Sequence, residues 1–479
     1  MMNASLKGRP GSWAVFLSYA LPAVAGTLLA TGATVVDGIF VGRCIGPVAL
    51  AAVNLTMPVL YVFLALGVMI AVGGASLAAR LAGGGAKGDA SRVFSASITL
   101  LALVSVVVAA LASIFLEPLL ALLGARGEVL EPTRRYLAPM LWFFVLSMLN
   151  IGLTSFLRAA GRPMLPLVLG LAGSAVDIFL DWLFIPKMGM GLWGAALSSG
   201  IGAAVEALLA LTIFASGRTP YSFVTPRLGK SELASVFGNG ASEFIGQLSV
   251  TLVTWLYNSV LMHRMGVTGV VAYTISGYLC FVEYMFVLGF CQGLWPLAAT
   301  ACGAGDRKAE AAWLRTALQA GLGVAAAMTL VSLLIPGAFA SLFLSLEAGT
   351  GAAGAFASDG GAASAAVGAA AVTRMALVCT GLSFLPAAFN MLASAYFTAV
   401  GDAKSSALIS SLRGLVLIAA LVLFLPLVLG DSGIWIALPA AELLTAAVSL
   451  AALGRRRRQA SVLPANAALC ETVEGSPAP

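Results

Sequence analysis

Residues 174–185 read Ser174-Ala175-Val176-Asp177-Ile178-Phe179-Leu180-Asp181-Trp182-Leu183-Phe184-Ile185, an apolar run that carries two acids. On a helix, positions i and i+4 share a face, so the carboxylates of Asp177 and Asp181 point in the same direction. An acid inside a membrane helix costs on the order of 2.5–3.5 kcal/mol on insertion scales. The pair is therefore a candidate functional site, unless the segment is a buried helix of a soluble protein.

The composition of the whole chain decides between these two alternatives. The 479 residues are 60% hydrophobic and only 10% charged, whereas soluble domains carry about 25% charged residues. Apolar windows of roughly 20 residues recur from Trp13 almost to Leu453, which is the pattern of membrane-spanning helices. We therefore predict an all-α polytopic membrane protein.

The apolar windows predict twelve transmembrane helices. Most of the 26 Lys and Arg residues fall at the two ends and in the loops after even-numbered spans, so both termini are expected in the cytoplasm. The run Arg455–Arg458 fits a topological anchor on that side better than a lipid-specific site. The predicted spans are roughly 13–40, 48–79, 92–116, 136–157, 165–186, 191–215, 236–261, 269–300, 312–344, 372–398, 405–429 and 433–453.

An internal repeat relates the two halves of the chain. A shift of 220 places Gly73 on Gly293, and a later shift of 240 places Asn150 on Asn390. Each half holds six spans, so the halves have the same orientation and form two parallel six-helix lobes around a central cleft. The predicted domains are an amino-terminal lobe at 1–226, a carboxy-terminal lobe at 227–460 with a Gly/Ala-rich loop insertion at 348–371, and a cytoplasmic tail at 461–479.

The acids do not follow this repeat, because apolar or aromatic residues occupy the equivalent places in the second half. Asp37, Asp181 and Ser199 each lie roughly 9–12 Å below the outer surface, at 1.5 Å of helix per residue. With Asp177 they are expected to form one oxygen-rich pocket. Such a pocket can carry a proton or hold a sodium ion between carboxylate and hydroxyl oxygens, and the sequence leaves both open. A purely structural polar network is the remaining alternative.

Further candidates lie outside this pocket. Pro22 lacks a backbone donor inside the first span and is expected to kink that helix, with a fixed, motionless bend as the alternative. Glu243 lies one turn before Gln247 in the seventh span and is the best candidate to attract a cationic substrate. Glu206 and Glu442 are weaker candidates. The residues proposed for the substrate cleft are Glu243, Gln247, Tyr273, Glu283 and Asn390, although aromatic positions at helical spacing are more often core.

Several other functions lack the residues that they need. The six cysteines show no regular spacing and His263 is the only histidine, so no disulfide framework, zinc site or catalytic dyad is expected. The stretch Gly83–Gly88 lacks the spacing of a phosphate-binding loop. We expect a transporter and not an enzyme, with no cofactor except a coupling proton or sodium ion. We also expect a monomer in membrane lipid that binds neither nucleic acid nor nucleotide.

Several local motifs occur together within residues 10–455. They are Leu21-Pro22, Val36-Asp37-Gly38-Ile39-Phe40-Val41-Gly42-Arg43, Ala49-Leu50-Ala51-Ala52 with Pro58, the approach from Gly73 to the loop at Gly85, Arg158-Ala159-Ala160-Gly161-Arg162-Pro163, and residues 177–185. Through these motifs the chain resembles the multidrug and toxic compound extrusion (MATE) family, and its second half looks closer to the bacterial branch with staphylococcal-type multidrug exporters.

The resemblance implies a secondary antiporter of a bacterial plasma membrane that exports organic, often cationic, compounds by alternating access against inward proton or sodium flow. The family's amino-lobe site matches Asp37, Asp181, Asp177 (where many relatives carry Asn) and Ser199 (often Thr). Some members also use an acid of the tenth span, where this chain has Asn390. A lipid-linked sugar flippase of the same superfamily is the rival interpretation. It would be expected to have a cationic cleft, whereas the intramembrane charges predicted here are mostly acidic.

Overall fold

The computed structural model describes residues 9–226, 229–337 and 362–462, and within these ranges the chain forms helices and no strand. Eleven of the described helices are long and apolar enough to cross a membrane. One of them, α8 (Lys230–Gly303), has 74 residues and would be far longer than a bilayer of about 30 Å if it were straight. It is interrupted at Gly266 (φ 63°, ψ −151°), so it supplies two spans. The all-α polytopic membrane fold with twelve spans is confirmed.

The first half of the chain forms one bundle of helices. Its helices are α1 (Trp13–Phe40), α2 (Pro47–Gly83), α3 (Lys87–Ile114), the short α4 (Leu116–Leu122), α5 (Leu130–Ala159), α6 (Met164–Trp182) and α7 (Gly191–Ala215).

The second half forms another bundle. It consists of α8, α9 (Arg307–Leu334), α11 (Ala362–Val400), α12 (Ala403–Ser411), α13 (Leu417–Leu429) and α14 (Ser432–Val462). Single π-helical turns extend three of the helices: η2 (Val41–Ile45), η4 (Leu183–Lys187) and η6 (Leu412–Val416).

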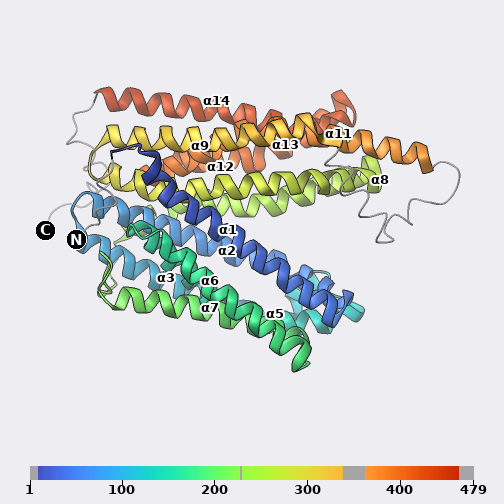
Figure 1. Ribbon diagram of the computed structural model, residues 1–479, viewed down its shortest axis with the longest axis horizontal. Helices are drawn as coiled ribbons and strands as arrows, with labels where there is room; N and C mark the ends of the chain where they lie inside the picture. Colours follow the sequence, from blue (N-terminus) through green and yellow to red (C-terminus); the bar gives the residue numbers. More distant parts are fainter. Residues whose placement is uncertain (1–8, 227–228, 338–361, 463–479) are drawn as a thin grey trace.

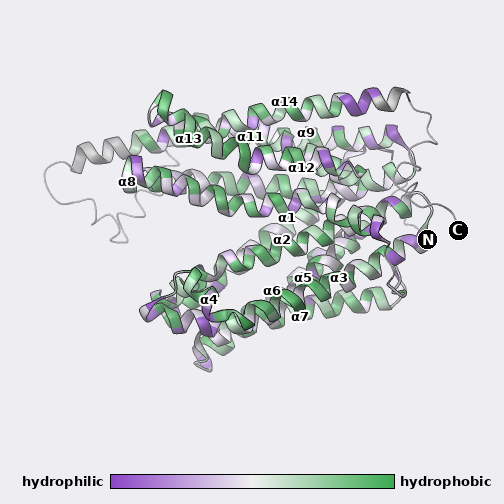
Figure 2. Ribbon diagram, turned by 180° about the vertical axis from the view of Figure 1, so that it is seen from behind, coloured by the Kyte–Doolittle hydropathy of each residue, from purple (hydrophilic) through white to green (hydrophobic). Residues whose placement is uncertain are grey.

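The two bundles, which we call the amino lobe and the carboxy lobe, lie side by side and diverge along their length (Figure 1). They approach each other at the end where α1 begins and α14 ends, which we call the basal end, and separate toward the opposite, distal end. Figure 2 shows hydrophobic residues along the length of both bundles and hydrophilic residues gathered at their ends, as expected for helices in a bilayer.

Glycines let the lobes touch backbone to backbone at the basal end. A Cβ atom on Gly303 of α8 would overlap the carbonyl of Arg80 on α2, and one on Gly83 would overlap the carbonyl of Thr300. Because only glycine lacks that atom, these positions set how closely the two helices approach.

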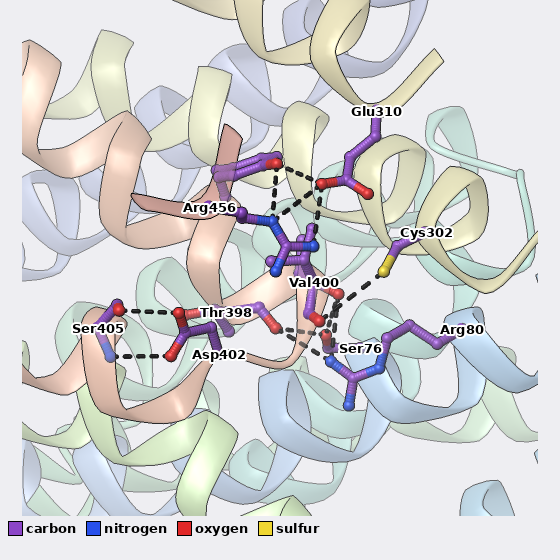
Figure 3. A network of polar contacts seen from close by, with 11 residues as sticks. Ser76, Arg80, Cys302, Glu310, Thr398, Val400, Asp402, Ser405 and Arg456 are labelled. Carbon is purple, nitrogen blue, oxygen red and sulfur yellow. Dashed lines mark hydrogen bonds and ion pairs between the residues drawn. The ribbon is translucent and has the colours of Figure 1, made fainter. Parts of the chain in front are cut away.

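Polar contacts close the same junction (Figure 3). The Ser76 hydroxyl on α2 donates to the carbonyl of Thr398 at 2.9 Å, and the Arg80 guanidinium donates to the carbonyl of Ala399 at 3.2 Å. Both carbonyls lie in the last turn of α11, where helix carbonyls have no partner within the helix. Side chains of the amino lobe therefore satisfy the end of a carboxy-lobe helix.

The structure contradicts the predicted insertion at 348–371 in part, and around Pro22 in the first span it leaves the prediction of a kink open. The predicted insertion 348–371 lies outside the described residues up to 361, but residues 362–371 are helical because α11 begins at Ala362. The loop prediction is therefore wrong for that part; its alanines, which suggested weak packing, are also the best helix formers. The helix α1 is continuous through Pro22, so the kink stays a prediction.

Candidate functional site

Three acids predicted from the sequence meet near the distal end of the amino lobe. Asp37 lies in the last turn of α1, while Asp177 and Asp181 lie in the last two turns of α6. One carboxylate oxygen from each acid lies within 4.8 Å of the other two. Asp181 is fully buried and the other two are half-buried. The structure thus joins side chains that are about 140 residues apart in sequence into one cluster.

Two adjacent serines of α7 complete the cluster. The Ser198 hydroxyl donates to Oδ1 of Asp181. The Ser199 hydroxyl donates to the carbonyl of Ala195 at 3.2 Å and interacts electrostatically with Asp177. Sequence reasoning proposed Ser199 and missed Ser198, because counting depth along a helix does not fix which of two neighbouring residues faces a given acid.

The cluster holds carboxylate oxygens that lack partners. Oδ1 of Asp37, Oδ1 of Asp177 and Oδ2 of Asp181 are buried and accept no hydrogen bond from any described residue. None of the three acids forms an ion pair with a described Lys or Arg. Buried ionised carboxylates without counter-charge are costly. A proton shared between them, or a monovalent cation held by their oxygens, removes that cost.

The backbone is unusual next to these acids. The helix α1 passes into the π-helical turn η2 after Asp37, and α6 passes into η4 after Asp181. The two π-helical turns pack against each other. Isolated π-helical turns in membrane and soluble helices occur frequently at functional sites, and here they flank the acid cluster on its distal side.

Glu206 of α7 continues the line of acids toward the basal end. It accepts a hydrogen bond from the Asn150 amide of α5 and interacts electrostatically with Asp177. A Cβ atom on Gly173 would overlap the Glu206 side chain, so Glu206 packs against α6 one turn beyond Asp177. From the sequence Glu206 is only a weaker candidate, because its distance from the other acids depends on how α6 and α7 pack.

The carboxy lobe contains a different charged network. Arg413 of η6 forms an ion pair with Glu442 of α14 at 3.0 Å. The Asn390 amide of α11 donates to Glu442 Oε2 at 2.7 Å and accepts a hydrogen bond from Ser449 at 2.9 Å. Asn390 is fully buried, so in this conformation it lies within the lobe.

The other residues proposed for a substrate cleft lie on α8. Glu283 is 4% exposed, leaves Oε1 without a hydrogen-bond partner among the described residues, and interacts electrostatically with Arg413. Glu243 is half-buried and interacts with the same arginine, and Gln247 is half-buried one turn further on. Tyr273 stacks on Tyr257, with ring centroids 4.9 Å apart. The sequence analysis missed Arg413.

A family model described as MatE matches residues 22–183, which include Asp37, Asp177 and Asp181. Over these residues the chain is similar to that family. The multidrug export protein MepA of Staphylococcus aureus (strain MRSA252) is 29% identical over 286 residues, which are 59% of this chain and 63% of that protein. MepA of Staphylococcus saprophyticus is 29% identical over 288 residues, with the same coverage. The matched part of this chain spans about 63% of the curated relatives' length.

Solved structures agree on the fold along almost the whole chain. An outward-facing multidrug resistance MATE family transporter of the MOP superfamily superposes with a TM-score of 0.84 at 23% identity, covering 96% of this chain and 98% of that one. A MOP superfamily transporter from Pyrococcus furiosus, described as having a binding pocket of reverse polarity, superposes with a TM-score of 0.83 at 23% identity and the same coverage. The family resemblance inferred from the sequence motifs is confirmed.

Proposed function

We propose that this protein is a secondary antiporter of the bacterial plasma membrane that exports organic, cationic compounds in exchange for protons or sodium by alternating access. The similarity to the multidrug export protein MepA of Staphylococcus supports export of several drugs and a bacterial plasma membrane. Two lobes that meet at the basal end and diverge at the distal end match one of the two states that alternating access requires (Figure 1).

The observation that carries the proposal is the cluster of Asp37, Asp177 and Asp181 with its unpartnered oxygens. Intramembrane acids are expensive and mark ion pathways in transporters. With Ser198 and Ser199 they offer both carboxylate and hydroxyl oxygens, which suit a proton as well as sodium. Uptake of the ion at this cluster would neutralise the acids and favour one arrangement of the lobes over the other.

The charged side chains around Arg413 in the carboxy lobe indicate the charge of the cargo. Arg413 is a half-buried cation of the kind that a flippase for an anionic, lipid-linked sugar would need, but Glu442 already neutralises it at 3.0 Å. Glu243 and Glu283 remain around the same arginine. Around Arg413 the acids therefore outnumber the base, which favours a cationic cargo over a pyrophosphate.

Drug susceptibility tests the proposal directly. Bacteria that lack their main exporters are given the chain, the Asp37→Asn variant or an empty vector, and the inhibitory concentrations of cationic dyes and antiseptics are measured. We expect raised tolerance with the unaltered chain alone, provided that immunoblots show equal amounts of both proteins in the membrane. Equal tolerance in all three strains would contradict export of these compounds.

A further inference from the structure

A large cavity opens at the basal end of the carboxy lobe, far along the molecule from the acid cluster. Its volume is about 1190 Å³, and it lies between α9, α11 and α14 beside the segment that leads into α1. Its lining includes cationic side chains of α9 and α14 and a row of leucines on α9. Neither the coupling acids nor Glu243 and Glu283 line it, so the proposed transport function leaves this cavity unexplained.

The acids in the cavity wall are already engaged. Glu310 accepts the guanidinium of Arg456 at 3.0 Å and the hydroxyl of Tyr396, and Asp402 accepts the hydroxyl of Ser405 at 2.8 Å (Figure 3). Glu310 is therefore paired with a cation of the protein, and Asp402 is hydrogen-bonded within it.

Three of the cations have no such partner. Lys308, Arg315 and Arg457 line the cavity, are exposed, and form no ion pair with a described residue. Their positive charges face one space, where an anion would be attracted by all three.

The cavity wall beside these charges is apolar and extends from them along α9. Leu314, Leu318 and Leu322 follow one face of α9 at intervals of four residues. Their row extends roughly 12 Å along the helix, from the level of the charged residues toward the membrane interior. A soluble anion would use the cations but not this wall. A phospholipid matches both, with its phosphate at the cations and its acyl chain along the leucines.

We propose that this cavity binds an anionic phospholipid, whose phosphate group pairs with Lys308, Arg315 and Arg457 and whose acyl chain lies along Leu314, Leu318 and Leu322. Cationic pockets between helices at the inner membrane face are suited to such headgroups. The site assigns a second role to Arg457, part of the run that also fits a topological anchor. It is independent of the coupling chemistry.

Native mass spectrometry of the purified full chain tests the site. The protein is mixed with phosphatidylglycerol or phosphatidylcholine of equal chain length, and retained lipid molecules are counted. We expect selective retention of phosphatidylglycerol, weakened on the order of 100-fold in Lys308→Ala/Arg315→Ala/Arg457→Ala, because each surface cation adds about a factor of five. The matched control Arg218→Ala/Lys230→Ala/Lys404→Ala removes three other exposed cations and should retain the lipid like the unaltered chain.

A second variant separates a lipid from a soluble anion. Leu318→Ser/Leu322→Ser keeps every charge but removes the apolar wall, so phosphatidylglycerol retention should fall while the net charge is unchanged. Equal retention of the two lipids, or an equal loss in the control triple variant, would overturn the proposal. Binding of inorganic phosphate at the same concentration as the lipid, unaffected by the leucine changes, would assign the cavity to a soluble anion instead.

Discussion

Ser198 donates its hydroxyl proton to Asp181, while the second oxygen of that acid has no hydrogen-bond partner. A hydrogen bond to an ionised group contributes about 1.5–3 kcal/mol, which is about 10–100-fold in an equilibrium constant. We expect Ser198→Ala to change the apparent affinity for the coupling ion by about that factor, measured as the ion concentration that gives half-maximal transport. Thr212→Ala on the same helix, which removes only a bond to the backbone of Leu209, should leave it unchanged.

Arg413 and Glu442 form an ion pair in the carboxy lobe in which the glutamate is buried and the arginine is partly exposed. Removing one partner of such a pair costs about 3–5 kcal/mol, because the other charge stays buried alone, whereas apolar replacement of both is often neutral. Arg413→Met should therefore lower the free energy of unfolding by about that amount, and Arg413→Met/Glu442→Met should recover most of it. Thermal unfolding in detergent measures the three proteins. A double variant as unstable as the single one would show that the pair does not act as a unit.

Among the site residues, the acids could be predicted from the sequence, whereas some of their partners could not. Asp37, Asp177 and Asp181 are conspicuous because each interrupts an apolar run, and the structure brings all three together. Ser198 and Arg413 were missed because hydroxyls are common in membrane helices and a lone arginine gives no hint of its partner. Their roles depend on how helices rotate against one another, which spacing along a single helix does not determine.

At the scale of the elements, apolar run lengths predicted the spans well. Even α8, which is continuous in secondary structure, carries its break at Gly266, between the predicted spans 236–261 and 269–300. The π-helical turns η2, η4 and η6 were not predicted, because they depend on local shifts of backbone hydrogen bonds that composition does not record. Each of them adjoins or contains a charged residue of a buried network: Asp37, Asp181 and Arg413.

The close contact of α2 and α8 depends on Gly303, where a Cβ atom would overlap the carbonyl of Arg80. Overpacking of this kind costs about 1–3 kcal/mol, and here the cost falls only on the state in which the basal end is closed. We expect Gly303→Ala to increase the distance between spin labels at Lys87 and Lys404, one on each lobe, measured by pulsed electron resonance. Gly323→Ala, at a position with nothing within 4 Å, is the matched control. An unchanged distance in Gly303→Ala would contradict the role of this contact in closing the basal end.

In the whole molecule, the internal repeat relates packing residues of the two lobes but not their balance of charges. Asn150 and Asn390 occupy equivalent repeat positions, and each donates its amide to a glutamate of a later helix in its own lobe, Glu206 and Glu442. In the carboxy lobe Arg413 neutralises that glutamate, whereas Glu206 and the three clustered acids of the amino lobe form no ion pair with a described residue. The shared packing was visible in the sequence as a shift of 220 to 240 residues. The unequal charge balance became visible only once the side chains were placed.

In the proposed function, Asp37, Asp177 and Asp181 exchange a cation that drives cargo across the membrane. Purified protein in vesicles, given an imposed proton or sodium gradient, tests it through the accumulation of a fluorescent organic cation against its own gradient. We predict accumulation with at least one of the two gradients for the unaltered chain, and its loss in Asp37→Asn, while Glu117→Gln at an exposed acid transports normally. Undiminished gradient-driven accumulation in Asp37→Asn would contradict the claim.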